Sequence, residues 1–101
     1  ESLRQNIGDI KSVLAVFLKL LPGRLEELGK AVHSQDAQKI QHITHTMKGS
    51  CNQFGAHGLA DLCSQAESMA RKNDLSGISA LYERLKQSAG VTTNFLQEQL
   101  D

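Results

Sequence analysis

The sequence predicts an all-α protein, an antiparallel up-down four-helix bundle with a short extra helix at the N-terminus. Apolar residues recur at three- and four-residue spacing along almost the whole chain, β-branched residues do not alternate as in strands, and proline occurs once. Short polar breaks separate the periodic segments, and short connections place successive helices antiparallel. With 101 residues, 40% of them hydrophobic, the chain fits a single domain over residues 1–101.

The short extra helix is expected over residues 2–6, and a long helix is expected to start at Asp9, a residue type favoured at helix N-caps. Pro22-Gly23 falls within the long helix and either kinks it or separates two helices; the continuous register of leucines on both sides favours the kink. The predicted buried face of this segment consists of Ile10, Val13, Leu14, Phe17, Leu18, Leu21, Leu25 and Leu28.

A helix over residues 36–54 comes next, with Asp36 as its N-cap and Gly55 as its C-terminal stop. Another helix starts near His57, and the last one follows a turn at residues 72–74, with Gly90 as a candidate bend. The buried face of the first of these two is expected to hold Leu59, Leu62, Cys63, Ala66, Met69 and Ala70. That of the last is expected to hold Leu75, Ile78, Leu81, Tyr82, Leu85, Phe95 and Leu96.

The segment from His45 to Ser50 is the most informative part of the chain. Gly49 costs roughly 1 kcal/mol against alanine in a helix interior, so it requires a reason. On a helical wheel, His45 points away from a core stripe made of Ile40, Ile43, Met47, Cys51 and Phe54. Its expected surface neighbours are polar or lack a side chain: Gln38, Gln41, His42, Lys48, Gly49 and Asn52. His45 is therefore predicted to be exposed on a flat, uncharged rim with one cation, and Gly49 to clear space for a partner that approaches it.

This pattern suits phosphoryl transfer. Neutral imidazole is a nucleophile near physiological pH, and the cation of Lys48 can offset the charge of a phosphoryl group on His45. The sequence has no P-loop, paired carboxylates or metal-ligand cluster, so no independent catalytic activity is expected. The domain would act as a shuttle for partners that hold the catalytic metal.

Other functions are less well supported by the sequence. Zero net charge and few aromatic residues argue against nucleic-acid binding, and no apolar run is long enough to span a membrane. His42 and His45 could touch one metal ion, but that face offers no further ligand, so no metal site is expected. Cys51 and Cys63 are expected to be reduced and buried, although a single disulfide is an alternative.

The site segment resembles a known family. The residues that carry this resemblance are His45, Lys48, Gly49, Ser50, Gly55, Leu59, Cys63 and Glu67, with Phe17 and Asp36 upstream. Their types and spacing are similar to those of the histidine-containing phosphotransfer (HPt) domains of bacterial phosphorelays. The resemblance implies that His45 is the phosphoacceptor, on its solvent-facing ring nitrogen, that Lys48 stabilises the phosphoryl group and that Gly49 leaves room for the partner. It implies a structural rather than a catalytic role for Glu67.

The implied partners are response-regulator receiver domains, which supply a phospho-aspartate and Mg²⁺; no cofactor is expected in this chain. Gln38, Gln41, His42 and Asn52 form the expected docking rim. The isolated domain is expected to be monomeric and cytoplasmic, without direct membrane contact. The non-methionine start is compatible with the C-terminal domain of a hybrid sensor histidine kinase at the inner membrane, and a free-standing shuttle remains open. The alternative function is a non-catalytic helical dimerisation or adaptor module.

Overall fold

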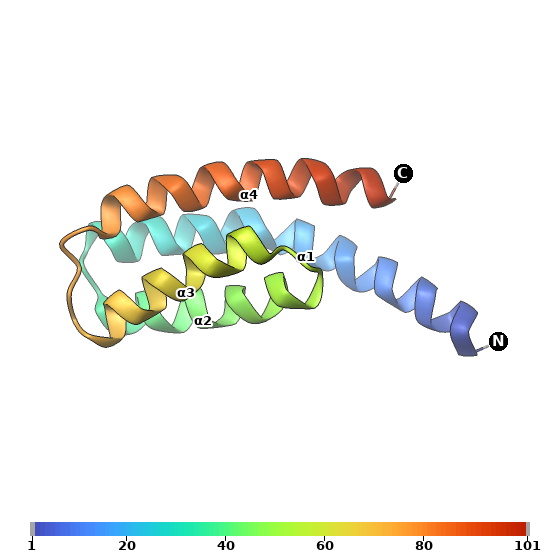
Figure 1. The fold of residues 1–101 in the computed structure, drawn as a ribbon, viewed down its shortest axis with the longest axis horizontal. Coiled ribbons are helices and arrows are strands. Elements are labelled where there is room, and N and C mark those ends of the chain that lie inside the picture. The colour runs from blue at the N-terminus through green and yellow to red at the C-terminus, as the bar shows by residue number, and fades with distance from the viewer. Residues whose placement is uncertain (1, 101) are drawn as a thin grey trace.

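The computed structural model describes the backbone of residues 2–100 and the side chains of residues 10–100. It contains four helices: α1 (Ser2–His33), α2 (Ala37–Gln53), α3 (His57–Arg71) and α4 (Ile78–Leu100). Figure 1 shows them running alternately up and down, and each packs against two others: α1 against α2 and α4, and α3 against α2 and α4. The predicted antiparallel four-helix bundle is confirmed. None of the helices described over residues 2–100 has the length and apolar character needed to cross a membrane.

The start of the chain differs from the sequence prediction. α1 is one continuous helix, so the separate helix over residues 2–6 and the new start at Asp9 are wrong. Gly8 weakens a helix but does not by itself end one. Pro22 also lies inside α1, which excludes two helices divided at that position. Its missing N–H removes one hydrogen bond to the carbonyl of Leu18, which a long, well-packed helix tolerates.

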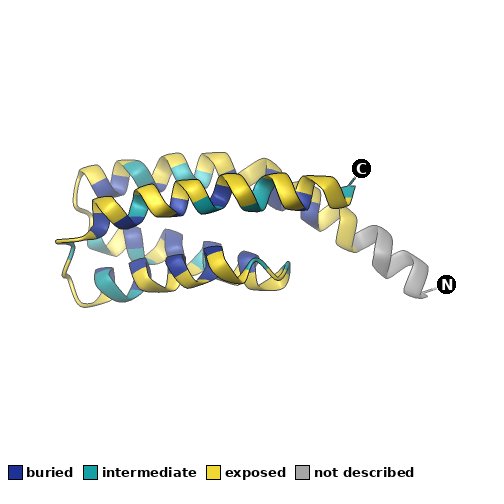
Figure 2. Ribbon diagram, turned by 45° about the horizontal axis from the view of Figure 1, so that its top comes forward, coloured by how far each residue is buried: buried dark blue, intermediate teal, exposed yellow. Residues whose placement is uncertain are grey.

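The hydrophobic core runs along the inner sides of all four helices, as the dark blue residues of Figure 2 show. Most of the predicted core positions are buried, but three are wrong: Ile10, Val13 and Phe95 are 58%, 44% and 62% exposed. Ile10 lies one turn before Leu14, the first described residue of α1 that is buried. Val13 lies with the exposed Val16 and Leu20 at three- and four-residue spacing, beside the buried stripe of α1. On α4 the neighbouring Leu96 is buried instead of Phe95. Leu75 precedes α4, which begins at Ile78.

The ends of α2 follow the predicted capping. The Asp36 carboxylate accepts a hydrogen bond from the Lys39 N–H at 3.1 Å. At the other end Gly55 has a φ of +73°, and the Ala56 N–H donates to the Cys51 carbonyl at 2.8 Å, which closes the helix and turns the chain into α3. These caps fix where α2 starts and stops, and therefore which of its residues face α3.

Helices α2 and α3 pack against each other, and several of their buried residues have small side chains. The almost completely buried ones include Thr44, Cys51, Cys63, Ala66 and Ala70. Residues of this size allow two helix backbones to approach closely. A longer side chain of α3 can therefore reach the face of α2 that carries His45.

Candidate functional site

His45 lies in the middle of α2 and its side chain is 69% exposed. The helix buries Ile40, Ile43, Met47 and Cys51 on the opposite side, so the predicted orientation of His45 is confirmed. An exposed imidazole on a regular helix is accessible to a protein partner from solvent.

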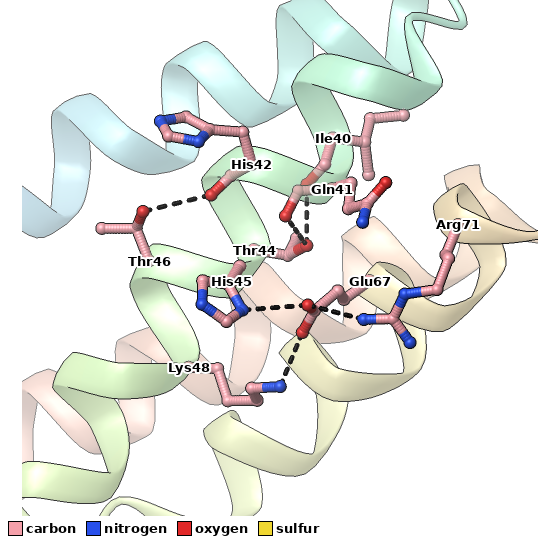
Figure 3. A network of polar contacts seen from close by, with 9 residues as sticks. All are labelled: Ile40, Gln41, His42, Thr44, His45, Thr46, Lys48, Glu67 and Arg71. Atoms are coloured by element: carbon pink, nitrogen blue, oxygen red, sulfur yellow. Dashed lines mark hydrogen bonds and ion pairs between the residues drawn. The ribbon is translucent and has the colours of Figure 1, made fainter.

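The centre of the site is a buried carboxylate on α3. The side chain of Glu67 is only 4% exposed and contacts three nitrogen groups (Figure 3). Its Oε2 lies 2.9 Å from Nδ1 of His45 and accepts a hydrogen bond from Nη2 of Arg71 at 2.9 Å. Its Oε1 accepts a hydrogen bond from Nζ of Lys48 at 2.6 Å. Glu67 thus joins α2 to α3 and holds the ring of His45 in one orientation.

The charges around Glu67 explain why a carboxylate is stable in this position. An unpaired buried carboxylate would be strongly unfavourable. The hydrogen bond from Lys48 lowers the pKa of Glu67, with a further lowering by the hydrogen bond from His45, against the opposing effect of burial. Glu67 is therefore ionised at neutral pH. The cations of Lys48 and Arg71 outnumber this single anion, so the cluster keeps one surplus positive charge beside the imidazole.

The ionised state of Glu67 determines the tautomer of His45. A carboxylate can only accept hydrogen bonds, so Nδ1 of His45 must carry the hydrogen. In the neutral ring the lone pair then belongs to Nε2. Figure 3 shows this second ring nitrogen on the side of the imidazole away from Glu67. The geometry therefore leaves Nε2 as the nucleophilic atom.

Gly49 follows His45 by one helical turn and is exposed. A Cβ built on Gly49 would meet no described atom within 4 Å apart from its chain neighbours and the backbone of its own helix. Nothing inside the domain therefore requires a glycine at this position. The space that it leaves lies outside the protein surface, where a partner would approach His45.

Two hollows lie beside His42, and His45 lines one of them. One, of about 490 Å³, is lined by Gln38, Gln41, His42, His45, Glu67 and Arg71. The other, of about 360 Å³, lies between α1 and α2 and is lined by Leu20, Gly23, Arg24, Glu27, His42, Ile43 and Thr46. Three of the four predicted rim residues thus share a hollow with His45, while Asn52 is exposed but does not line it. His42 belongs to both hollows and connects them.

The predicted flat, uncharged rim with one cation is wrong. A helical wheel of α2 contains Lys48 but cannot contain Glu67 and Arg71, because these two charged residues come from α3. Lys48 is also less exposed than the wheel suggests, at 29% of its side chain. The family resemblance includes Glu67, and a second signal in the sequence is its place one turn from Cys63 and Ala70, as a charged residue on the buried face of its helix. No comparable signal distinguishes Arg71 from other surface arginines.

The described side chains of residues 10–100 contain no group of three potential metal ligands close enough to hold an ion. The site therefore consists of an imidazole, one carboxylate and two cations. This set can orient a nucleophile and attract an anion.

Such a fold and site define a histidine phosphotransfer domain, and the chain belongs to the Hpt domain family, whose sequence model matches residues 12–98. Domains of this family act in the phosphorelays of two-component systems, where they interact with receiver domains. Among solved structures, the chain is similar to histidine-containing phosphotransfer protein B of Pseudomonas aeruginosa PAO1. The TM-score is 0.88 and the identity is 28%, over 98% of this chain and 87% of that one.

Two kinds of relatives are found among characterised proteins. The phosphorelay protein LuxU of Vibrio vulnificus is 28% identical over 93 residues, which cover 86% of this chain and 81% of LuxU. The sensor protein TorS of Escherichia coli K12 is 42% identical over 54 residues, which cover 54% of this chain. The matched part is 6% of TorS, so the similarity to that protein concerns one small segment of it.

Proposed function

We propose that Nε2 of His45 accepts a phosphoryl group from the phospho-aspartate of a receiver domain and passes it to the aspartate of a second receiver. The observation that carries this proposal is the contact between Nδ1 of His45 and the buried carboxylate of Glu67 at 2.9 Å. It selects the tautomer in which Nε2 is unprotonated and exposed to solvent.

The transfer step needs little from this chain beyond positioning and charge. The Nε2 lone pair attacks phosphorus, a P–N bond forms, and the P–O bond to the receiver aspartate breaks. The electron pair leaves with the aspartate carboxylate, and the hydrogen stays on Nδ1. The imidazole thereby becomes positively charged, and the Glu67 carboxylate stabilises that charge as it develops. The contact between Glu67 and His45 also assists transfer from His45 back to an aspartate, because the forward and reverse reactions pass through the same transition state.

Lys48 and Arg71 have two effects in this mechanism. They keep Glu67 ionised and in place, and their surplus positive charge favours the arrival of an anionic phosphoryl group. In the structure, Nζ of Lys48 contacts Glu67 rather than the space beside Nε2. We infer that Lys48 stabilises the phosphoryl group through the field of the cluster, or by a change of rotamer when the partner is bound.

The receiver is proposed to dock across α1 and α2. Three apolar residues of α1 are exposed, Val13, Val16 and Leu20, at 44%, 53% and 46%. Leu20 lines the hollow that reaches His42, and His42 also lines the hollow of His45. The surface is therefore continuous from an apolar stripe to the phosphoacceptor. Around it we place the polar rim of Gln38, Gln41, His42 and Asn52, where partner specificity would lie.

The receiver would supply the Mg²⁺ that the reaction requires. A shuttle must also release its partner, so we expect a small interface and fast dissociation, with a domain that is monomeric by itself. The free buried thiols of Cys51 and Cys63 support a reducing, cytoplasmic location. Both a hybrid sensor kinase and a free-standing shuttle fit the domain. A helical adaptor without phosphotransfer would not need the Glu67 cluster.

The experiment that tests the proposal is transfer of labelled phosphate from a panel of phosphorylated receivers, with Mg²⁺ present. Wild-type protein and His33→Gln should become labelled, and His45→Gln should not. His33 is the control because it is also an exposed histidine, at the end of α1 and outside both hollows. Label on His45→Gln at the wild-type rate would refute the assignment, and no label on any variant would favour the adaptor function.

A further inference from the structure

Gly23 is an exposed glycine inside α1, and its own surroundings do not require a glycine there. Glycine is unfavourable in a helix interior because it loses more conformational freedom on folding than any other residue. Gly23 does not have the positive φ that would favour glycine. A Cβ added to it would find no described atom within 4 Å beyond its chain neighbours and its own helix backbone. The open space beside Gly23 is therefore available to another molecule, as is the space beside Gly49.

This space belongs to the hollow of about 360 Å³ between α1 and α2. On the α1 side, Gly23 shares the hollow with Leu20, which precedes it by three residues and is 46% exposed. On the α2 side, the hollow is lined by His42, Ile43 and Thr46. An aliphatic side chain seated here would cover the exposed part of Leu20, which is favourable because apolar surface is removed from water. The lining thus favours an apolar occupant.

Arg24 and Glu27 complete the lining of this hollow with opposite charges. Neither of them takes part in the ion pairs that the described side chains form with one another. With both side chains ionised, the two formal charges cancel, so the hollow does not select a partner by the sign of its charge. The size and shape of the occupant therefore decide how well it fits.

The position of the hollow identifies its occupant. His42 lines this hollow and also the hollow of His45, and Figure 3 shows the ring of His42 on the side of α2 toward α1. Even a small protein–protein interface covers about 500 Å² on each partner, which is more than the surroundings of one side chain. A receiver domain that docks at His45 therefore also covers the neighbouring hollow.

We propose that Gly23 is a specificity-determining residue, which keeps the hollow between α1 and α2 open for one apolar side chain of the receiver. This inference rests on the proposed function and adds to it a position that selects among receivers. A receiver with an aliphatic side chain of matching size at this contact docks well, and one with a larger or charged side chain docks poorly. Gly49 has a different role, because it clears the approach to His45 itself, which every receiver needs.

The test measures phosphoryl transfer from a panel of phosphorylated receivers, with Mg²⁺ present, to the wild type, Gly23→Ala and Gly23→Leu. For a receiver that fills the hollow, we expect Gly23→Leu to raise KM about 5- to 150-fold, the loss that overpacking of a filled contact produces. Gly23→Ala should raise KM less. The loss should fall on KM rather than on kcat, because the Glu67 cluster lies outside this hollow. For a receiver that leaves the hollow empty, KM should change less, so the order of preference among receivers should shift.

Two controls separate docking from folding and from the chemistry of His45. Gly90→Leu carries the same substitution at an exposed glycine of α4 and should keep the wild-type KM with every receiver. Labelling by phosphoramidate, a small phosphoryl donor, reports whether His45 is intact without any docking. If Gly23→Leu loses helix content or reacts more slowly with phosphoramidate, Gly23→Ala, which adds only one methyl group, decides instead.

Two results would refute the role of Gly23. One is a wild-type KM for its variants with every receiver, and the other is an equal rise of KM with all of them, which indicates a general obstruction. In either case transfer from receivers to the wild type leaves the proposed function intact. If the wild type is labelled by phosphoramidate but by no receiver, the proposed function fails, and the role of Gly23 fails with it.

Discussion

Replacing Gly49 with alanine separates the stability of the domain from its access to partners. Apart from its chain neighbours and the backbone of its own helix, an added Cβ at Gly49 meets no described atom within 4 Å, so the variant introduces no clash with another part of the domain. Alanine is favoured over glycine in a helix interior by about 1 kcal/mol. We therefore expect Gly49→Ala to be more stable than the wild type. For a domain of this size, that gain corresponds to a rise in Tm of about 4–8 °C.

The same methyl group should slow phosphoryl transfer. In the complex it lies one helical turn from His45, where the receiver must approach closely. Forcing a methyl group into a packed contact costs about 1–3 kcal/mol, which corresponds to roughly a 5- to 150-fold loss of rate. Gly49→Leu should slow transfer further, because its side chain occupies more of the same space.

Gly90→Ala is the matched control. Gly90 is also an exposed glycine inside a helix, and an added Cβ there has no neighbour within 4 Å. It lies on α4, away from His45, so it should raise the Tm by a similar amount without a change in transfer. Thermal unfolding and the initial rate of labelling from a phosphorylated receiver give both quantities. If Gly49→Ala transfers as fast as Gly90→Ala, the explanation of Gly49 by partner access is wrong.

Three further expectations concern charge and packing. The pKa of Glu67 is lowered from its ordinary value near 4.5, mainly by Lys48. The ionised Glu67 therefore adds to the free energy of unfolding at pH values above 4.5, and this contribution is lost as the pH falls through the lowered pKa of the folded state. In denaturant titrations over pH, the stability gap between wild type and Glu67→Gln should therefore narrow in acid; a constant gap would contradict the ion-pair account. Lys48→Ala should lose about 1–2 kcal/mol, because it removes a partner from a buried carboxylate, and a variant as stable as wild type would show that this pair contributes nothing. Gly29→Ala should also destabilise, by up to about 2 kcal/mol net, because a packing cost of about 1–3 kcal/mol is offset by about 1 kcal/mol of helix propensity; the added Cβ would lie 2.5 Å from the Tyr82 hydroxyl. Adding Tyr82→Phe should recover part of that loss, and a stabilised Gly29→Ala would contradict the packing.

Much of the fold could be predicted from local signals. The direction in which His45 points is determined by two features of α2: its caps at Asp36 and Gly55, and its buried stripe of apolar residues. Both features depend on residues that are close in sequence. Glycine and proline signals were less reliable near the N-terminus, because α1 continues through both Gly8 and Pro22. A glycine or proline within a helix lowers its stability, but the packing of the other residues of the same helix can offset this loss.

The errors in the predicted core have a geometric cause. Periodicity identifies the apolar side of a helix but does not show how far the neighbouring helices extend along it. Ile10 precedes the first buried residue of α1, Leu14, by one turn, and Val13 lies beside the buried stripe. Phe95 is exposed on α4. Some of these exposed residues are candidates for binding a partner rather than for the core.

The chemistry of the site could be predicted only in part. His45, Lys48 and Gly49 are on one helix, so their spacing indicates a common surface. Glu67 and Arg71 join them through the packing of α3 on α2, which no spacing within α2 can show. The sequence of α2 alone therefore predicts an exposed cation at Lys48, whereas Lys48 bonds to a buried carboxylate.

Glu67 is proposed to hold the hydrogen on Nδ1 of His45, so that the phosphoryl group is attached to Nε2. NMR of the phosphorylated domain with ¹⁵N-labelled histidine rings tests this assignment, because coupling to phosphorus identifies the modified nitrogen. We predict phosphorus coupling at Nε2 of His45 and a hydrogen on its Nδ1. Phosphorus on Nδ1 of His45, or on another residue, would contradict the claim.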